Sequence, residues 1–265
     1  MKTIFITGAS SGLGKATAKL FQSRGWNVIA TMRHPEKETE LAVLENVTLL
    51  QLDVTDTMQV KETTEKALEL ADVDVVYNNA GYGLMGPLES YSDEQIVRQL
   101  NTNLLGVILV TKAFIPHFRA KKSGLFLSTT SIGGIVTFPF SSIYHAAKWG
   151  IEGWSESMSY ELGLNNIQIK TIAPGGIKTD FGGRSVDFVG DENYAEALEQ
   201  FNSIFDSSSY NEAEEVAEVV HTAATDGKKQ LRYVVGPAAQ YLAARRDEIG
   251  RQSQVEETYT GIFNQ

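Results

Sequence analysis

The 265-residue sequence contains no cysteine, which excludes disulfides, thiolate nucleophiles and cysteine-ligated metals. It is also poor in positive charge, with 23 basic against 33 acidic side chains and a formal net charge of −10. This balance argues against nucleic acid or an anionic membrane as a partner, because both bind basic faces. Any phosphate-bearing ligand must be held by local backbone amides and a few placed cations.

Long hydrophobic runs are missing as well. No apolar stretch approaches the roughly 20 residues of a membrane-spanning helix. A strand-like segment follows Met1 almost at once, so we expect no cleaved signal and a soluble, cytoplasmic protein without a metal site. Hydrophobic residues make up 42% of the chain, enough for a substantial core.

Apolar strand-like runs alternate with helical segments, which predicts a parallel sheet with right-handed crossovers. The expected strands are 2–7, 27–31, 47–52, 74–77, 124–128, 167–172 and 231–236, and the clearest helices are 61–70, 92–118, 142–162 and 211–224. The predicted fold is therefore α/β, a Rossmann-like doubly wound seven-stranded parallel sheet with helices on both faces. We expect one domain over residues 1–236 and a helical extension over 237–265, packed on the subunit surface or on a partner.

A glycine-rich turn, GASSGLG, follows the first strand and precedes a helix, as in dinucleotide-binding units. Gly8 permits the turn, Gly12 lets the backbone approach a pyrophosphate, and Gly14 allows the helix to pack closely on the strand. The helix start offers free N–H groups and a positive dipole end to phosphates. The spacing is G-x-x-x-G-x-G, and such a turn by itself also occurs as a purely structural element.

The end of the second strand lacks an acidic residue. Met32 stands where an Asp or Glu would accept a hydrogen bond from the ribose 2′-hydroxyl of NAD, and Arg33 follows it. A guanidinium suits a 2′-phosphate. The predicted cofactor is NADP(H), with Ser10 or Ser11 as further donors, and the alternative is that Arg33 is a solvated loop charge.

Two further strand ends carry residues suited to a nucleotide. Asp53 could accept from an adenine amino group, although helix capping near Asp56 is a rival role. The fourth strand ends in the small residues Asn79, Ala80 and Gly81, where a ligand could lie against the backbone.

Tyr144 and Lys148 stand four residues apart in a predicted helix, so their side chains share one face. An ammonium beside a phenol lowers the phenol pKa, which predicts a proton donor near neutral pH. Ser131, at an expected strand end, could return its hydroxyl to the same pocket. Asn103 lies among leucines and is either a helix-kinking residue or part of a polar network.

These residues together resemble the short-chain dehydrogenase/reductase family, in particular its NADPH-preferring branch with hydroxysteroid- and retinol-type members. The resemblance rests on TGASSGLG at 7–14, NNAG at 78–81, YHAAK at 144–148 and APGGIKT at 173–179, in that order. It covers residues 1 to about 180 continuously.

The resemblance implies a catalytic tetrad. Tyr144 would exchange a proton with the substrate oxygen, Ser131 would orient that oxygen, Lys148 would lower the Tyr144 pKa and hold the nicotinamide ribose, and Asn103 would position a water that links Lys148 to solvent. The further cofactor contacts it implies are Leu13 in the glycine turn, Asp53 and Val54 at the adenine, Asn79 to Gly81, Pro174 and Gly175, and Ile177 and Thr179 at the carboxamide. His145, beside the tyrosine, is larger than usual and is expected to be a packing residue.

In this family a segment such as 181–210 covers the substrate. With Phe138 and Phe181 it suggests an apolar pocket around Ser131 and Tyr144. The predicted function is NADPH-dependent reduction of an apolar ketone or aldehyde, and the alternatives are a non-catalytic NADP(H) sensor and an NAD-linked alcohol dehydrogenase. The family implies a homo-oligomer, a dimer or tetramer, built on the Trp149 and Trp154 face and the helix of Asn103.

Overall fold

A seven-stranded parallel sheet forms the centre of the computed structural model, which describes residues 1–178, 186–204 and 210–263. Its strands are β1 (Thr3–Thr7), β2 (Asn27–Met32), β3 (Val47–Gln51), β4 (Val75–Asn78), β6 (Gly124–Thr129), β7 (Ile167–Pro174) and β11 (Arg232–Val235). They lie in the order β11-β7-β6-β4-β1-β2-β3, so the strand order reverses between β1 and β4. The predicted Rossmann-like sheet is confirmed.

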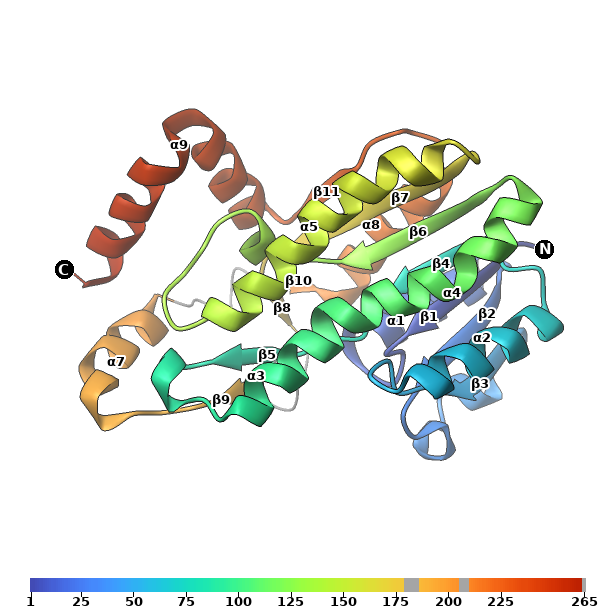
Figure 1. Ribbon diagram of the computed structural model, residues 1–265, viewed down its shortest axis with the longest axis horizontal. Coiled ribbons are helices and arrows are strands. Elements are labelled where there is room, and N and C mark those ends of the chain that lie inside the picture. Colours follow the sequence, from blue (N-terminus) through green and yellow to red (C-terminus); the bar gives the residue numbers. More distant parts are fainter. Residues whose placement is uncertain (179–185, 205–209, 264–265) are drawn as a thin grey trace.

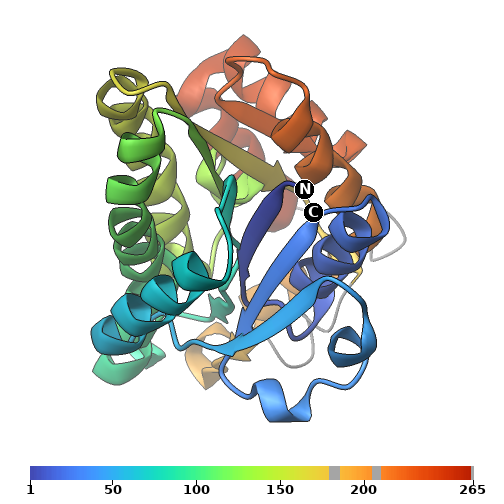
Figure 2. The ribbon, with the colours of Figure 1, turned by 90° about the vertical axis from the view of Figure 1, so that its right-hand side faces the viewer.

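Helices cover both faces of this sheet (Figure 2). One face carries α1 (Gly12–Ser23) and α8 (Ala213–Thr225), and the other carries α2 (Thr57–Leu70), α4 (Gly106–Lys121) and α5 (Ser142–Gly163). Strand side chains alternate between two apolar cores, because successive residues point to opposite faces. Ile4 and Ile6 belong to the α1/α8 core and Phe5 to the α2/α4/α5 core, and all three are fully buried.

The segment 92–118, expected as a helix, belongs to one helical run with a wider turn inside it. α3 (Asp93–Leu100) starts with a capping box between Ser92 and Gln95, in which each side chain bonds the backbone of the other residue. A π-helical turn, η4 (Asn101–Leu105), then joins α3 to α4. Such turns are rare and often lie at functional sites, and this one contains Asn103.

Several short elements lie beyond the carboxyl ends of the sheet strands (Figure 1). They include β5 (Gly83–Met85), which pairs with β9 (Val186–Phe188), and β8 (Ile177–Lys178), which pairs with β10 (Asn211–Glu212). The helix α7 (Ala195–Ser203) lies there too. The described residues also form single-turn segments at Pro35–Lys37, Leu41–Val43, Leu88–Ser90, η5 (Ile132–Gly134) and Glu192–Tyr194.

The chain ends in α9 (Pro237–Phe263), which is two helices joined at Gly250, where φ is 78° and ψ is 171°. The second helix returns beside the first, since Arg246 donates to Gln254 at 3.1 Å and Gln254 donates to the Leu242 carbonyl at 3.3 Å. The α9 hairpin also packs on α7. None of the helices in the described ranges is both long enough and apolar enough to span a membrane.

Candidate active site

The glycine turn between β1 and α1 is held tightly against the end of β4. Gly8 has a φ of +68°, and a Cβ there would lie 2.7 Å from the Ala80 Cα. A Cβ on Gly14 would lie 2.3 Å from the Gly8 carbonyl oxygen. Asn79 donates from its side chain to the Thr7 and Gly8 carbonyls at 3.1 and 3.2 Å. The Asn79 amide therefore positions the turn.

The start of α1 has the features of an anion site. Ser11 is its N-cap but makes no side-chain capping bond, and the first turn carries no acidic residue. Ser10 is exposed at the same turn. The side chain of Leu13 is buried in the α1/α8 core, so only its backbone can meet a ligand. A phosphate group fits this turn, because unpaired N–H groups and hydroxyls favour negative charge.

The end of β2 presents one unengaged cation. Met32 is buried, whereas Arg33 is exposed and forms no ion pair with any described residue. The nearby lysines differ, because Lys15 contacts Glu38 at 2.9 Å and Glu40 at 2.8 Å. Arg33 is thus the cation at this strand end that is available to a ligand.

Asp53 and Asp56 have separate roles at the start of α2. Asp56 is the N-cap and accepts from the amides of Met58 and Gln59 at 2.9 and 3.1 Å. Asp53 instead accepts from the Thr55 amide and hydroxyl at 2.9 and 2.7 Å through Oδ1. The capping role considered for this region therefore belongs to Asp56, and the adenine contact of Asp53 stays a prediction.

Ser131, Tyr144 and Lys148 converge at the carboxyl end of β6. Ser131 caps η5 by accepting from the Gly133 amide at 3.0 Å, and its hydroxyl also bonds the Tyr144 phenol. Lys148 lies one turn further along α5, with Nζ 5.6 Å from the centroid of the Tyr144 ring. The same Nζ donates to the Thr129 carbonyl at 2.9 Å. The spacing expected from the sequence brings the three side chains together.

Burial acts against ionisation at both members of the pair. It raises the pKa of Tyr144 above its ordinary value, and the hydrogen bond with Ser131 opposes this only in part. Burial also lowers the pKa of Lys148 to about 8, with the charge of Glu152 opposing it. In the chain without ligands, burial therefore outweighs the lowering of the Tyr144 pKa that was expected from the ammonium.

Asn103 joins the π-helical turn to the end of β4. Its amide nitrogen donates to the Tyr82 carbonyl at 2.6 Å, and its Oδ1 accepts from the Tyr82 amide at 3.0 Å. Of the two roles considered for this buried residue, the polar network describes its side chain. The water-positioning role implied by the family resemblance stays a prediction.

His145 does more than pack. Its Nε2 accepts from the Phe138 amide at 2.9 Å, so the neutral ring carries its proton on Nδ1, which donates to the Gly133 carbonyl at 2.7 Å. These bonds fix the loop between Ser131 and α5. Burial lowers the pKa of His145, which favours the neutral form that this arrangement needs. A loop closed by the neighbour of the tyrosine has no local sequence pattern, and the expectation of simple packing missed it.

The remaining predicted cofactor residues line the same edge of the sheet. Val54 is buried against Gly106, Pro174 ends β7, Gly175 donates to the Val235 carbonyl at 3.1 Å, and Ile177 is half-buried in β8. Ala80 is half-buried and Gly81 is exposed beside Asn103. Thr179 and Phe181 lie outside the described residues. The described chain holds no group of three or more His, Asp or Glu side chains that could bind a metal.

An aromatic cluster lies at the loop between Ser131 and α5. Phe140 contacts Tyr194, Phe201 and Phe263 with ring centroids 6.0, 5.7 and 6.4 Å apart. Its φ of 56° is unusual for a bulky residue and places backbone strain in this loop. Phe138 packs against the small core beneath α9. Within the described part of the segment 181–210, Phe201 is buried and Phe188 is 52% exposed.

Comparisons with known proteins agree with this geometry. A protein-family model described as "short chain dehydrogenase" matches residues 2–188. The chain is 32% identical to a 3-ketodihydrosphingosine reductase of Bacteroides thetaiotaomicron over 248 residues, which cover 91% of this chain and 90% of that protein.

Two solved structures are similar as well. A short-chain dehydrogenase from Streptomyces avermitilis superposes with a TM-score of 0.86 at 28% identity, covering 98% of this chain and 95% of that one. An alcohol dehydrogenase from Thermococcus sibiricus, complexed with 5-hydroxy-NADP, gives a TM-score of 0.73 at 28% identity, covering 91% and 98% of the two chains.

Proposed function

The chain belongs to the short-chain dehydrogenase family, and we propose that it is an NADPH-dependent oxidoreductase that reduces an apolar ketone or aldehyde to the alcohol. The observation that carries the proposal is the convergence of Ser131, Tyr144 and Lys148 at the carboxyl end of β6. In a doubly wound sheet, ligands bind at this edge, where the strand order reverses.

The residues present fit a nicotinamide dinucleotide. The turn from Gly8 to Gly14 and the start of α1 would hold its phosphates, and Arg33 would bind a 2′-phosphate. Asp53 and Val54 would contact the adenine, while Ile177 and Thr179 would contact the carboxamide. When bound, such a cofactor supplies the hydride for reduction or accepts it during oxidation.

The proton is the part of the reaction that the chain itself handles. Tyr144 would donate its phenolic proton to the substrate oxygen during reduction and remove it during oxidation. Ser131, already bonded to that phenol, would orient and polarise the same oxygen. In its charged form Lys148 would stabilise the tyrosinate that remains after transfer. Asn103 would position the path from Lys148 to solvent.

An apolar substrate is supported by the lining of the site. The aromatic cluster of Phe140, Tyr194, Phe201 and Phe263 would form one wall, and Phe138 would lie beside Ser131. We propose that residues 181–210 cover the substrate and that α9 completes this cover. The similar Bacteroides protein is named a 3-ketodihydrosphingosine reductase, which agrees with the reduction of a ketone.

The test is carbonyl-dependent oxidation of NADPH and NADH over a panel from small aldehydes to sterol-sized ketones. Tyr144→Phe should lower the rate by roughly 10²- to 10⁴-fold, because it removes only the transferable proton. Tyr160→Phe is the matched control, since Tyr160 lies on the same helix but is 72% exposed. Tight NADPH binding without turnover by any substrate would favour the non-catalytic sensor, and NADH preference would favour the NAD-linked dehydrogenase.

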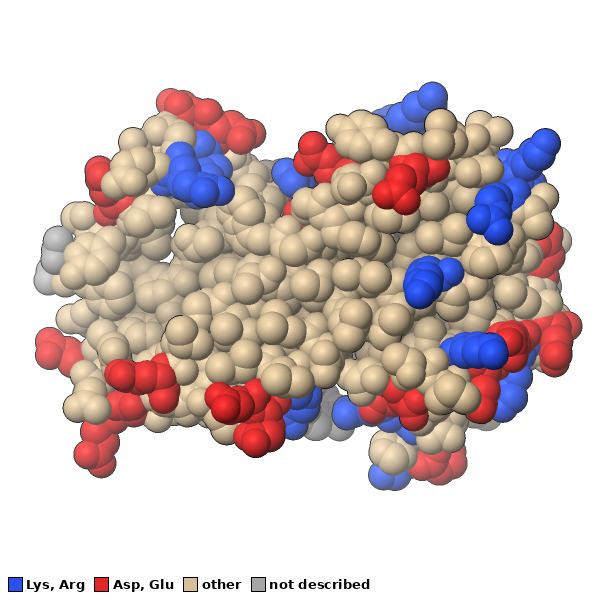
Figure 3. All heavy atoms as spheres, in the orientation of Figure 1, with Lys and Arg blue, Asp and Glu red and all other residues tan. Residues whose placement is uncertain are grey.

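We also propose a homo-oligomer that uses the face of α3, α4 and α5. This face is largely free of charge in Figure 3, and the helices on it expose apolar side chains at Val97, Leu105 and Tyr160. Trp154 is half-buried against the core, and Trp149 lies under α9. The proposed interface therefore rests on Val97, Leu105 and Tyr160 rather than on the two tryptophans. Sedimentation at micromolar concentration as a monomer would contradict the proposal.

A further inference from the structure

We propose that Glu152 is a positioning residue of the active site, a buried carboxylate that keeps Lys148 in its charged form. This inference rests on the proposed function, because it gives a role to the lysine of that site. Glu152 lies four residues after Lys148 on α5, which places both side chains on one face of the helix. Its residue surface is only 5% exposed.

The turn of α5 between the two residues is held in place by η5. A Cβ on Gly134 would lie 3.1 Å from the Glu152 Cγ and 3.1 Å from the Lys148 carbonyl oxygen. The backbone of the loop that carries Ser131 therefore packs directly against this turn. This close contact fixes the stem of the Glu152 side chain against the turn of helix that begins at Lys148.

Glu152 is bound to a polar row that crosses the sheet beneath α5. Asn78, Ser128, Thr171 and Arg232 are paired positions on the adjacent strands β4, β6, β7 and β11. Asn78, Ser128 and Thr171 are almost fully buried, although the row two residues earlier on the same face is apolar. The row starts at Asn78 in β4 and reaches the sheet edge at Arg232, whose side chain is 40% exposed.

The two carboxylate oxygens of Glu152 differ in their contacts. Oε2 accepts from the Arg232 Nε at 2.8 Å and from the Thr171 hydroxyl at 3.2 Å. Oε1 is buried and has no hydrogen-bond partner among the described residues. A buried carboxylate acts on charged groups beyond its ion-pair partner as well, since the surroundings screen its field weakly.

Lys148 is the group on which that field acts. The charged groups that face Glu152 are Lys148 on its own helix and Arg232 from β11, while β7 offers the uncharged Thr171 and η5 offers backbone. Lys170, the cation of β7, instead bonds Asp226 and the Ala223 carbonyl on the opposite face. Burial lowers the pKa of Lys148 and Glu152 opposes this, so the carboxylate sustains the cation at neutral pH.

A purely structural role makes a different prediction. If the Glu152–Arg232 pair only fastens α5 to β11, removing either partner should weaken the protein in the same way and leave Lys148 unaffected. If Glu152 acts on Lys148, the two removals have opposite signs. Glu152→Gln deletes an anion near Lys148 and lowers its pKa, whereas Arg232→Gln deletes a competing cation and raises it or leaves it unchanged.

The experiment is an NMR titration of the full chain labelled with ¹³C at the lysine ε-carbon. Lys148→Arg assigns the signal, and Glu156→Gln, an exposed change one turn further along α5, is the matched control. We expect Glu152→Gln to lower the Lys148 pKa by about one unit and Arg232→Gln not to lower it. The titration needs no substrate, so its result stands even if no carbonyl compound is turned over.

An unchanged Lys148 pKa in folded Glu152→Gln would overturn the inference, as would a fall of equal size in both single variants. Where Glu152→Gln leaves Arg232 unpaired and does not fold, the double variant Glu152→Gln with Arg232→Gln removes both charges. Its Lys148 pKa must then lie below that of Arg232→Gln alone. If turnover is found, the high-pH limb of kcat/KM should move by the same amount as the titration.

Discussion

The Lys148 Nζ lies 5.6 Å from the centroid of the Tyr144 ring, and burial penalises the ionised form of each side chain. Lys148 has a pKa of about 8, so its charge is present below that pH and is lost as the pH rises through it. Tyr144, with its raised pKa, stays protonated over the same range. Reduction needs a protonated tyrosine and a cationic lysine, so we expect kcat/KM for reduction to fall as the pH rises through about 8.

A pH profile of kcat/KM for reduction tests this expectation. Lys148→Arg is the informative comparison, since a guanidinium stays charged throughout and should remove the limb near pH 8 from whatever rate remains. Reduction that instead grew faster through this range would mean that another group controls the reaction.

The second prediction concerns cofactor choice. Exchanging Met32→Asp together with Arg33→Ala should shift preference from NADPH toward NADH, because an acid at the end of β2 accepts from a free 2′-hydroxyl and repels a 2′-phosphate. We expect the ratio of kcat/KM values to change by at least about 10-fold. Lys37→Ala removes a charge from the same exposed loop without altering the strand end. Unchanged NADPH selectivity in the double variant would refute the role given to Arg33.

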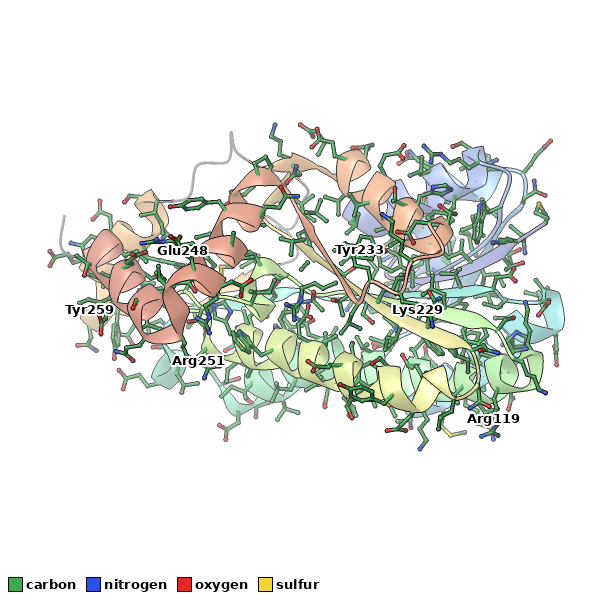
Figure 4. All side chains as sticks on the ribbon, turned by 90° about the horizontal axis from the view of Figure 1, so that it is seen from above. Arg119, Lys229, Tyr233, Glu248, Arg251 and Tyr259 are labelled. Atoms are coloured by element: carbon green, nitrogen blue, oxygen red, sulfur yellow. The ribbon has the colours of Figure 1, made fainter. Side chains whose placement is uncertain are left out.

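The third prediction concerns the attachment of α9 to the catalytic helix. The guanidinium carbons of Arg246 and Arg251 lie 5.4 and 5.3 Å from the centroid of the Trp149 ring, one from each helix of the hairpin (Figure 4, where Arg251 is labelled). Cation–π contacts contribute about 0.5–2 kcal/mol each, so Trp149→Leu should loosen both helices at once. We expect faster tryptic cleavage around Gly250 and a higher KM for large ketones, with kcat for small aldehydes nearly unchanged.

Arg119→Gln is the control for this prediction, because Arg119 is an exposed arginine near the far end of α4. Cleavage of Trp149→Leu at the wild-type rate would show that the α9 hairpin is held by its other contacts, such as Arg245 with Glu257.

The parts of this protein that follow from local pattern could be predicted from its sequence. Three features depend only on neighbours in the chain: the alternating apolar segments, the glycine turn, and the spacing of Tyr144 and Lys148. From these features the sequence predicted the parallel sheet and the proximity of the two side chains. Glu152 also forms an ion pair with Arg232, which lies 80 residues away in sequence. Contacts of that kind come from strand order and register, which the pattern within a segment does not encode.

The pKa of Tyr144 illustrates a second limit. The sequence places an ammonium near the phenol and so favours a lowered pKa, but the sign of the shift depends on how deeply the surrounding chain buries the ring. Trp149 is a similar case. The family resemblance implied a surface for another subunit around it, whereas the hairpin at Gly250 folds two arginines back over its ring.

The last prediction concerns His145. Replacing it in His145→Phe leaves the Gly133 carbonyl and the Phe138 amide without their partner, which should cost about 2–4 kcal/mol of unfolding free energy. The folded-state pKa of His145 lies below its ordinary value, so the folded chain binds fewer protons than the unfolded chain. Its contribution is therefore complete above about pH 6.5 and is lost as the pH falls below that value.

Urea unfolding of the wild type and His145→Phe near neutral pH and about one and a half units lower measures both effects. The gap between the two proteins should narrow on acidification, because only the wild type loses the buried neutral histidine. His34→Phe is the matched control, since His34 is an exposed loop residue. A gap that stayed constant or widened at the lower pH would show that His145 contributes by packing alone.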